Sequence, residues 1–269
     1  MPSNRLPLRF FTCNLKSLFY SVISYIFSFR GIPVSIGEAR LNLPPLHFRV
    51  YPPTYEELNL HTLMRIKFPH DSTAIDVGAH YGIYSIVLAK YLKLRVFAIE
   101  PTPYSFSVLL QTICMNSLQR LITPIRAAVS NKDGVSPFNI QQENGSVANS
   151  LVDYHHSEEP KYTSFVNVVK IDSIAYSTPV SFIKIDAEGV ELDVLSGALD
   201  TISKYKPIIL LGLHPAALSA IGYSLKDVQE FIKRLGYETL SYSSPGISHS
   251  NFLLQKSVFD IFIAPIKQQ

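Results

Sequence analysis

The sequence is poor in cysteine and in charged residues, and each shortage excludes a class of protein. Its 269 residues include only two cysteines, Cys13 and Cys114, too few for a disulfide framework or a cysteine-based zinc site, so we expect a cytoplasmic protein. Charged residues make up 17% and hydrophobic residues 47%, which argues against a disordered chain. Twelve glycines and eighteen prolines show no Gly-X-Y period and no tandem repeat, which excludes collagen-like and solenoid folds. The composition therefore predicts a globular protein.

The basic charge is concentrated in the N-terminal segment. The uncharged run within that segment is too short to cross a membrane. Residues 1–50 carry six basic side chains and one acidic one, whereas the other 219 carry 18 basic and 20 acidic. A nucleic-acid-binding protein would carry its basic residues on the folded domain, so we expect no nucleic-acid partner. The uncharged run at 17–29 has 13 residues, and a bilayer-spanning helix needs about 20.

This N-terminal arm has the spacing of an amphipathic helix. Four serines recur at steps of four, three and four between residues 17 and 28, which leaves a broad apolar face opposite them. We expect that face to pack on the main domain or on a second copy of the chain, as in a homodimer. Contact with a membrane surface is less favoured, because serine rather than lysine or arginine occupies the polar face. Two Pro-Pro pairs at 44–45 and 52–53 then place a boundary near residue 55, separating an arm and linker at 1–54 from a domain at 55–269.

Beyond this boundary, short β-rich runs alternate with helical spacing. Residues 73–78 form a β-rich run that ends in glycine, and apolar residues at helical spacing follow from 83 to 91. Residues 95–99 form a second strand, after which Thr102-Pro103 begins a helix that reaches Asn116. Further strands are expected at 121–127, 182–186, 207–214, 237–241 and 259–264, with helices at 190–205 and 224–235. The pattern predicts an α/β fold with a Rossmann-like, doubly wound and mostly parallel sheet, preceded by the helical arm.

The first strand ends in a turn suited to a nucleoside ligand. Gly78 and Gly82 allow close backbone approach, at the sheet edge where α/β folds bind their ligands. Glu100 ends the adjacent strand, where its two oxygens can accept both hydroxyl protons of a ribose. Asp76 would repel a pyrophosphate but favour the ammonium and sulfonium groups of S-adenosylmethionine, and the turn lacks Gly-x-Gly-x-x-Gly. The alternative is a glycine-containing turn with no ligand.

Three segments in this order carry a family resemblance. They are Ile-Asp-Val-Gly-Ala-His-Tyr-Gly at 75–82, Ala-Ile-Glu-Pro-Thr-Pro at 98–103 with Asn116, and Ile-Lys-Ile-Asp-Ala-Glu-Gly-Val-Glu at 183–191 followed by Leu195 and Gly197-Ala198. Across residues 70–215 the chain resembles the FkbM-type methyltransferase family. The resemblance implies an S-adenosylmethionine-dependent enzyme, usually an O-methyltransferase that acts on a hydroxyl group of a sugar or natural product. N-methylation of a small amine or peptide, and a catalytically silent scaffold, remain as alternatives. The cofactor-binding candidates are Asp76, Gly78, Ala79, Gly82, Glu100, Asn116 and Asp186.

The catalytic candidates are three polar residues near the ends of two later strands. Asp186 ends a strand and precedes a tight turn into a helix, so its carboxylate should either point into the cleft or cap that helix. Glu188 belongs to the site by the resemblance, and His214 ends a strand at the same sheet edge, as a general base or as a structural histidine. Many family members have an acidic residue where Gly212 stands, which leaves the identity of the base open.

Two further expectations concern metal ions and a loop. Asp186, Glu188 and His214 fall short of an octahedral oxygen set, so we expect no metal. The stretch at 134–172 interrupts the α/β alternation and contains Asn149, His155 and His156. It is either an ordinary polar surface loop or a lid over the acceptor.

Overall fold

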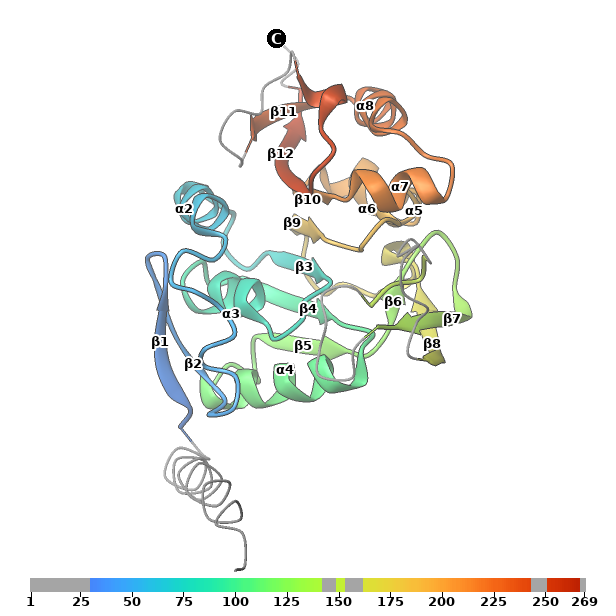
Figure 1. Cartoon of the computed structure of the whole chain (residues 1–269). Helices are drawn as coiled ribbons and strands as arrows, with labels where there is room; N and C mark the ends of the chain where they lie inside the picture. The colour runs from blue at the N-terminus through green and yellow to red at the C-terminus, as the bar shows by residue number, and fades with distance from the viewer. Residues whose placement is uncertain (1–29, 142–148, 153–161, 243–250, 267–269) are drawn as a thin grey trace, which may run out of the picture.

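The computed structural model describes residues 30–141, 149–152, 162–242 and 251–266, which fold around a seven-stranded central sheet (Figure 1). The strand order is β11-β12-β10-β9-β3-β4-β5. The predicted α/β fold with a Rossmann-like, doubly wound sheet is confirmed. The strands are β3 (Thr73–Val77), β4 (Arg95–Ile99), β5 (Ile122–Ile125), β9 (Val180–Ile185), β10 (Ile208–Leu213), β11 (Tyr237–Tyr242) and β12 (Phe259–Pro265).

The direction of the strands decides which residues meet at the edge of the sheet. Strands β5, β4, β3, β9 and β10 are parallel to one another, so their carboxyl ends lie along one edge. Strand β12 is antiparallel to both β10 and β11. Its first residues therefore lie at the same edge as the last residues of β10, and Asp260 pairs with Gly212.

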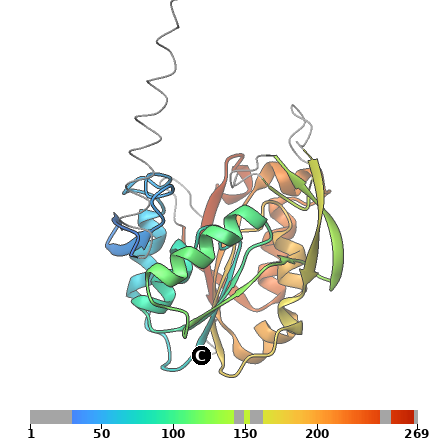
Figure 2. The same cartoon turned by 90° about the horizontal axis from the view of Figure 1, so that it is seen from below.

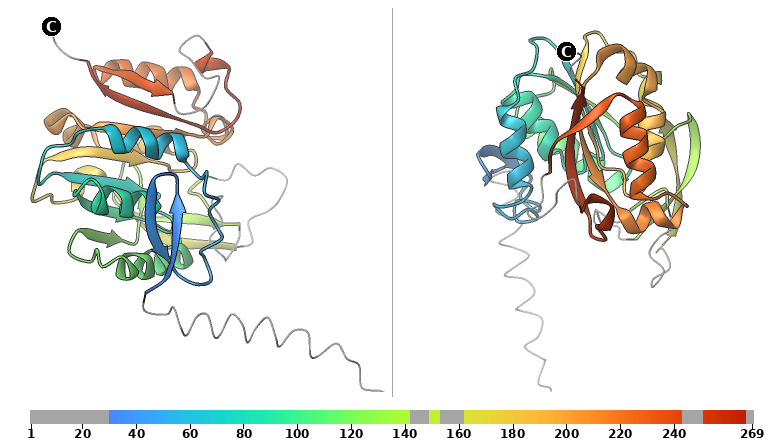
Figure 3. Two further views of the ribbon diagram at one scale, coloured as in Figure 1. Left: turned by 90° about the vertical axis from the view of Figure 1, so that its left-hand side faces the viewer. Right: turned by 90° about the horizontal axis from the view of Figure 1, so that it is seen from above.

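Helices cover both faces of the sheet (Figures 2 and 3). Alternate side chains of a strand point to opposite faces, so Ala74 of β3 joins one apolar core and Ile75 joins the other. One face carries α2 (Glu57–Arg65), α3 (Ile83–Lys90) and α4 (Pro103–Met115), and the other carries α5 (Glu191–Ser196), α6 (Leu199–Tyr205), α7 (Pro215–Ala220) and α8 (Leu225–Arg234). Within the described ranges, no helix is long and apolar enough to cross a membrane.

The residues assigned to the linker include a hairpin that packs on the domain. Strands β1 (Ile32–Ile36) and β2 (Ala39–Leu43) pair antiparallel, and Ile36, Leu41 and Leu43 are each at most 1% exposed within the core on the α3 side. The packed part of the chain thus begins before the predicted boundary at residue 55. The expected helix at 17–29 lies outside the described residues.

The helix predicted at 190–205 is wrong in one respect, because it consists of two short helices. Helix α5 ends at Ser196 and α6 begins at Leu199. Gly197 packs against the backbone of Ser130, a residue distant in the sequence. A Cβ at Gly197 would lie 2.2 Å from the carbonyl oxygen of Ser130. The carboxylate of Asp172 then accepts the backbone N–H groups of Asp200 and Thr201 in the first turn of α6. A tertiary contact and a remote cap therefore divide the helix.

The stretch predicted to be a loop or lid contains a second sheet. Strands β6 (Ala128–Val129), β7 (Gly134–Ile140) and β8 (Tyr162–Val169) lie in the order β6-β8-β7. The surface-loop expectation is therefore wrong for β7 and β8, which pair from Gly134↔Val168 to Ile140↔Tyr162. Along β7, the side chain of Phe138 is buried. His155 and His156 lie outside the described residues, so the lid hypothesis is not tested.

Candidate functional site

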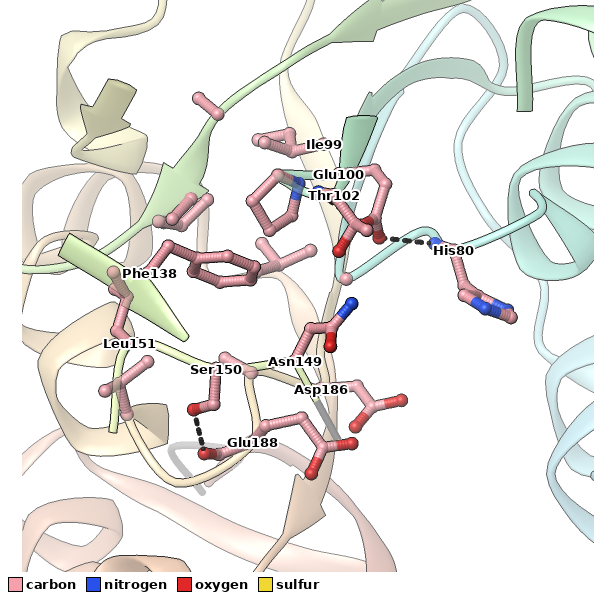
Figure 4. Close-up of a pocket in the computed structure, with 18 residues that line it drawn as sticks. His80, Ile99, Glu100, Thr102, Phe138, Asn149, Ser150, Leu151, Asp186 and Glu188 are labelled. Carbon is pink, nitrogen blue, oxygen red and sulfur yellow. Dashed lines mark hydrogen bonds between the residues drawn. The ribbon is translucent and has the colours of Figure 1, made fainter. Parts of the chain in front are cut away.

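A pocket opens where the carboxyl edge of the main sheet meets the small sheet (Figure 4). It offers about 630 Å³ of space, including the open solvent at its mouth. Of the predicted site residues, Gly78, Glu100, Asp186 and Glu188 line it. The other lining residues are Val77, His80, Ile99, Pro101, Thr102, Ala127, Ala128, Val129, Phe138, Asn149, Ser150, Leu151, Ala187 and Val190.

The apolar side of this pocket was not predicted from the sequence. Phe138 comes from β7, and Ser150 and Leu151 come from a short described segment that follows it. Figure 4 shows Asn149 between Glu100 and the acidic pair Asp186 and Glu188. The available sequence signal was short, because only Phe138, Asn139 and Ile140 alternate between apolar and polar, and such a strand inside a polar stretch is easily mistaken for a loop.

Glu100 is held at the end of β4 by backbone N–H groups. Its Oε2 accepts the N–H of His80 at 2.9 Å, and its Oε1 accepts the N–H of Thr102 at 2.8 Å. Burial raises the pKa of this carboxyl to about 7, although the two hydrogen bonds oppose that rise. Each carboxylate oxygen has a further lone pair, so Glu100 retains the capacity to accept ribose hydroxyl groups.

The glycines of the first turn are required by the close packing around them. Gly78 has a φ of +72°, and a Cβ there would lie 2.0 Å from the carbonyl oxygen of Asp186. Gly82 has a φ of +90°, and a Cβ there would lie 2.6 Å from Cδ1 of Leu109. Ala79 donates its N–H to the carbonyl of Ile99. Among Gly78, Ala79 and Gly82, only Gly78 lines the pocket.

Asp76 lies behind the pocket lining, fully buried. Its Oδ2 accepts the hydroxyl of Ser85 at 2.6 Å, and its Oδ1 lies 3.7 Å from Nζ of Lys184. Burial raises the pKa of Asp76, against the opposing effects of Lys184 and Ser85. Ser85 and Lys184 are thus the protein groups nearest this carboxylate, and its effect on a cationic ligand stays a prediction.

Asn116 stands apart from the pocket, which corrects its assignment to the cofactor site. It caps the carboxyl end of α4, where its Oδ1 accepts the N–H of Asn42 and its Nδ2 donates to the carbonyl of Asn42. This pair joins α4 to the hairpin strand β2. Its role in the described structure is therefore structural.

The structure brings together Asp186, Glu188 and His214, as predicted for residues at neighbouring strand ends. Nε2 of His214 lies 3.3 Å from Oε2 of Glu188 and 3.7 Å from Oδ1 of Asp186. Its Nδ1 lies 2.7 Å from Oε1 of Glu191, which is completely buried. Burial disfavours a charged imidazole, but the hydrogen bonds with Glu188 and Glu191 outweigh it and raise the pKa of His214 to about 11. At neutral pH, His214 is therefore an imidazolium.

Asp186 lines the pocket and lies beside a buried lysine. Its Oδ2 accepts a hydrogen bond from Nζ of the buried Lys184 at 3.2 Å. Burial raises its pKa, but the positive charges of Lys184 and His214 outweigh this and lower the pKa below its usual range. The carboxylate therefore stays charged and is a weak proton acceptor.

The same three residues were considered as metal ligands. One ligand atom from each of Asp186, Glu188 and His214 lies within 4.8 Å of the others, a spacing that a divalent cation could bridge. A cation bound here would have to displace the proton from Nε2 of His214, because a metal-ligating imidazole is neutral. We assign no metal, and metal independence stays a prediction.

The comparisons with known proteins identify the domain. A family model described as "Methyltransferase FkbM domain" matches residues 76–239. The chain is 22% identical over 158 residues to "Methyltransferase 1" of Beauveria bassiana (strain ARSEF 2860), covering 49% of this chain and 61% of that protein. It is 24% identical over 159 residues to "Methyltransferase sdnD" of Sordaria araneosa, covering 48% of this chain and 61% of that protein. The chain thus spans about three fifths of the length of these curated relatives.

A solved structure agrees in fold. The crystal structure of methyltransferase FkbM from Methylobacillus flagellatus KT matches with a TM-score of 0.50 and 19% identity, covering 74% of this chain and 45% of that chain. At that identity the likeness concerns the fold alone. The family model, however, covers more than half of the sequence. This chain belongs to the FkbM methyltransferase family and carries an S-adenosylmethionine-dependent methyltransferase domain.

Proposed function

We propose that the protein transfers the methyl group of S-adenosylmethionine to a hydroxyl oxygen of a sugar or small natural product. When bound, S-adenosylmethionine supplies a methyl group on a sulfonium. The observation that carries the proposal is the acidic pair Asp186 and Glu188 in a pocket that Glu100, at the end of β4, also lines. A hydroxyl acceptor must lose a proton during transfer, and carboxylates at the reacting end suit that chemistry.

The described residues fit this cofactor. Glu100 is a buried carboxyl group that lines the pocket and can accept further hydrogen bonds on both oxygens, which suits the two hydroxyl groups of a ribose. The apolar side formed by Ile99, Val129 and Phe138 suits a flat adenine ring. The negative charge of Asp186 and the backbone at Gly78 lie at the other side, where an amino acid tail with positive charge would be favoured. These assignments are proposals for the residues of this chain.

On the acceptor side, we assign Asp186, Glu188 and His214 different roles. Asp186 stays ionised, so it favours positive charge nearby and can accept a hydrogen bond that orients an acceptor. His214, as an imidazolium bonded to Glu191, holds the carboxylates of Asp186 and Glu188 in position. Since His214 already carries its proton at neutral pH, we now propose it as a positioning residue rather than the base.

The cellular setting and partners remain part of the proposal. Cys114 is an exposed free thiol, which suits a reducing compartment such as the cytoplasm. The partner expected from the proposed reaction is a small hydroxyl-bearing acceptor. Packing of the N-terminal arm on a second copy of the chain stays a prediction.

One experiment tests the cofactor and the reaction in turn. Freshly purified protein is denatured and the supernatant is searched by mass spectrometry for S-adenosylmethionine or its demethylated product. The protein is then incubated with methyl-labelled S-adenosylmethionine and separate panels of hydroxyl and amine acceptors. We expect cofactor in the supernatant and label on oxygen. Label found only on nitrogen would contradict O-methylation, and no binding of the cofactor would contradict the whole proposal.

A further inference from the structure

Two carboxylates meet over Gly212, and one of them comes from a strand outside the site described above. Asp260 of β12 pairs with Gly212 of β10. A Cβ on Gly212 would lie 2.9 Å from Oδ1 of Asp260 and 3.4 Å from Oδ1 of Asp186. Gly212 does not have a positive φ, so its backbone does not require glycine. What glycine provides here is the space that these two carboxylate oxygens occupy.

The side chain of Asp260 is held in this orientation by α2. Nδ2 of Asn59 donates to Oδ2 of Asp260 at 2.8 Å and also to Oε2 of Glu56. Asn59 is only 3% exposed, and Tyr84 donates its hydroxyl to the same Glu56 oxygen at 2.8 Å. Because Oδ2 of Asp260 is held by this network, Oδ1 is left toward Gly212 and Asp186. Asp260 is partly exposed, and its Oδ1 lies beside Gly212 as does Oδ1 of Asp186, which lines the pocket.

The groups around Asp260 give it a different acidity from Asp186. Burial, followed by the negative charges of Glu56 and Asp186, raises the pKa of Asp260 to about 7, against the smaller opposing effects of Asn59 and Lys184. Tyr55 and Tyr84 also face this group, and both stay neutral because burial raises the pKa of each phenol. Asp186, beside Lys184, is instead held below its usual pKa. Of the two carboxylates over Gly212, Asp260 is the stronger base.

We propose that Asp260 is the catalytic residue that accepts the proton of the acceptor hydroxyl, while Asp186 orients that hydroxyl. This rests on the proposed function. The acceptor O–H bond breaks and its proton passes to Oδ1 of Asp260, the oxygen forms a bond to the methyl carbon, and the carbon–sulfur bond breaks with its electron pair left on sulfur. The proton on Asp260 then passes to solvent. The carboxylate that serves as the base thus comes from β12. It lies opposite Gly212 of β10, which has no side chain.

Two substitutions test this assignment by different routes. Asp260→Asn keeps the shape and the contact with Asn59 but removes the base, so turnover should fall by about 10²- to 10⁴-fold. Gly212→Ala inserts a Cβ at 2.9 Å from Oδ1 of Asp260, and the end of a flexible side chain can move away. That variant should fold normally and lose part of its rate.

Affinity for S-adenosylmethionine, measured by calorimetry, should change little in either variant, because Asp260 and Gly212 do not line the pocket. Asp200→Asn, at an exposed position on α6, is the matched control and should behave as wild type.

The pH dependence of kcat distinguishes a catalytic role of Asp260 from a purely structural one. In wild type, kcat should rise with pH through about 7 as Asp260 ionises, and this limb should be absent in Asp260→Asn. Carbon NMR of protein labelled at the aspartate carboxyl groups should show a signal that titrates near 7 and disappears in that variant. Unchanged turnover in Asp260→Asn, or the absence of such a signal, would overturn the assignment. If the wild type methylates no hydroxyl acceptor, the proposed function fails, whereas the NMR titration still decides whether Asp260 is poised as a base.

Discussion

The imidazole of His214 and the carboxylate of Glu191 form a buried ion pair, with Nδ1 and Oε1 2.7 Å apart. Glu191 begins α5 and His214 follows β10, so the pair joins a helix to the sheet beneath it. Oε1 of Glu191 also accepts the N–H of Gly189. The pair therefore fixes the turn that carries Glu188, as well as the orientation of the imidazole.

Removing Glu191 should destabilise the protein in a pH-dependent way. The Glu191→Ala variant leaves an imidazolium buried without its nearest counter-ion, which should lower the free energy of unfolding at pH 7 by about 3 kcal/mol. The folded-state pKa of His214 is about 11 against an ordinary 6.5, so the contribution is fully present below 6.5 and is lost as the pH rises toward 11. Urea denaturation at several pH values measures this. Glu191→Gln keeps an acceptor oxygen and should lose less, and equal stability of wild type and Glu191→Ala at pH 7 would contradict the ion pair.

The carboxylate of Glu100 should control affinity for the cofactor. We expect Glu100→Ala to weaken S-adenosylmethionine binding by about 30- to 150-fold, which corresponds to the loss of about 2 to 3 kcal/mol for hydrogen bonds to a charged group. Since the pKa of Glu100 is about 7, wild-type affinity should also weaken as the pH falls below 7 and the carboxyl is protonated. Isothermal calorimetry measures both effects. Glu57→Ala, an exposed position on α2, is the control, and unchanged affinity in Glu100→Ala would remove Glu100 from the cofactor site.

Transfer should not require a metal ion. Lys184 and His214 already place positive charge beside Asp186 and Glu188, so treatment with a chelator should leave the rate of methyl transfer unchanged. The measurement is turnover before and after chelation, followed by the addition of magnesium. Activity that vanished with the chelator and returned with magnesium would show that the three residues form a metal site.

Removal of the N-terminal arm should expose apolar surface. We expect a chain that begins near Gly31 to aggregate, because the surface that the arm covers would lose its apolar partner. Size-exclusion chromatography with light scattering measures this. The packing hypothesis would be wrong if the truncated chain stayed monodisperse with unchanged oligomeric state and activity and lost only its binding to anionic liposomes.

The sequence by itself determined the main sheet and much of the site, because the signals involved are local. Residues 73–77 and 95–99 are runs of β-forming residues that end at Gly78 and Glu100, and the structure contains both as parallel strands. Carboxyl ends of parallel strands share one edge, so the order of elements was enough to bring Glu100, Asp186 and His214 to the same side of the sheet. The family signature at 183–191 lies in the same region.

Tertiary structure alone decided features that depend on contacts between distant segments. The break at Gly197 follows from its approach to Ser130, and the place of Asn116 follows from its pairing with Asn42. The acidities of Asp186 and Asp260 diverge because Lys184 lies against one, whereas Glu56 faces the other. Asp260 is 48 residues from Gly212 in the sequence, and only the antiparallel pairing of β12 with β10 places its carboxylate there. A pKa depends on burial and on the charges a few ångströms away, and a linear pattern of residues does not specify either.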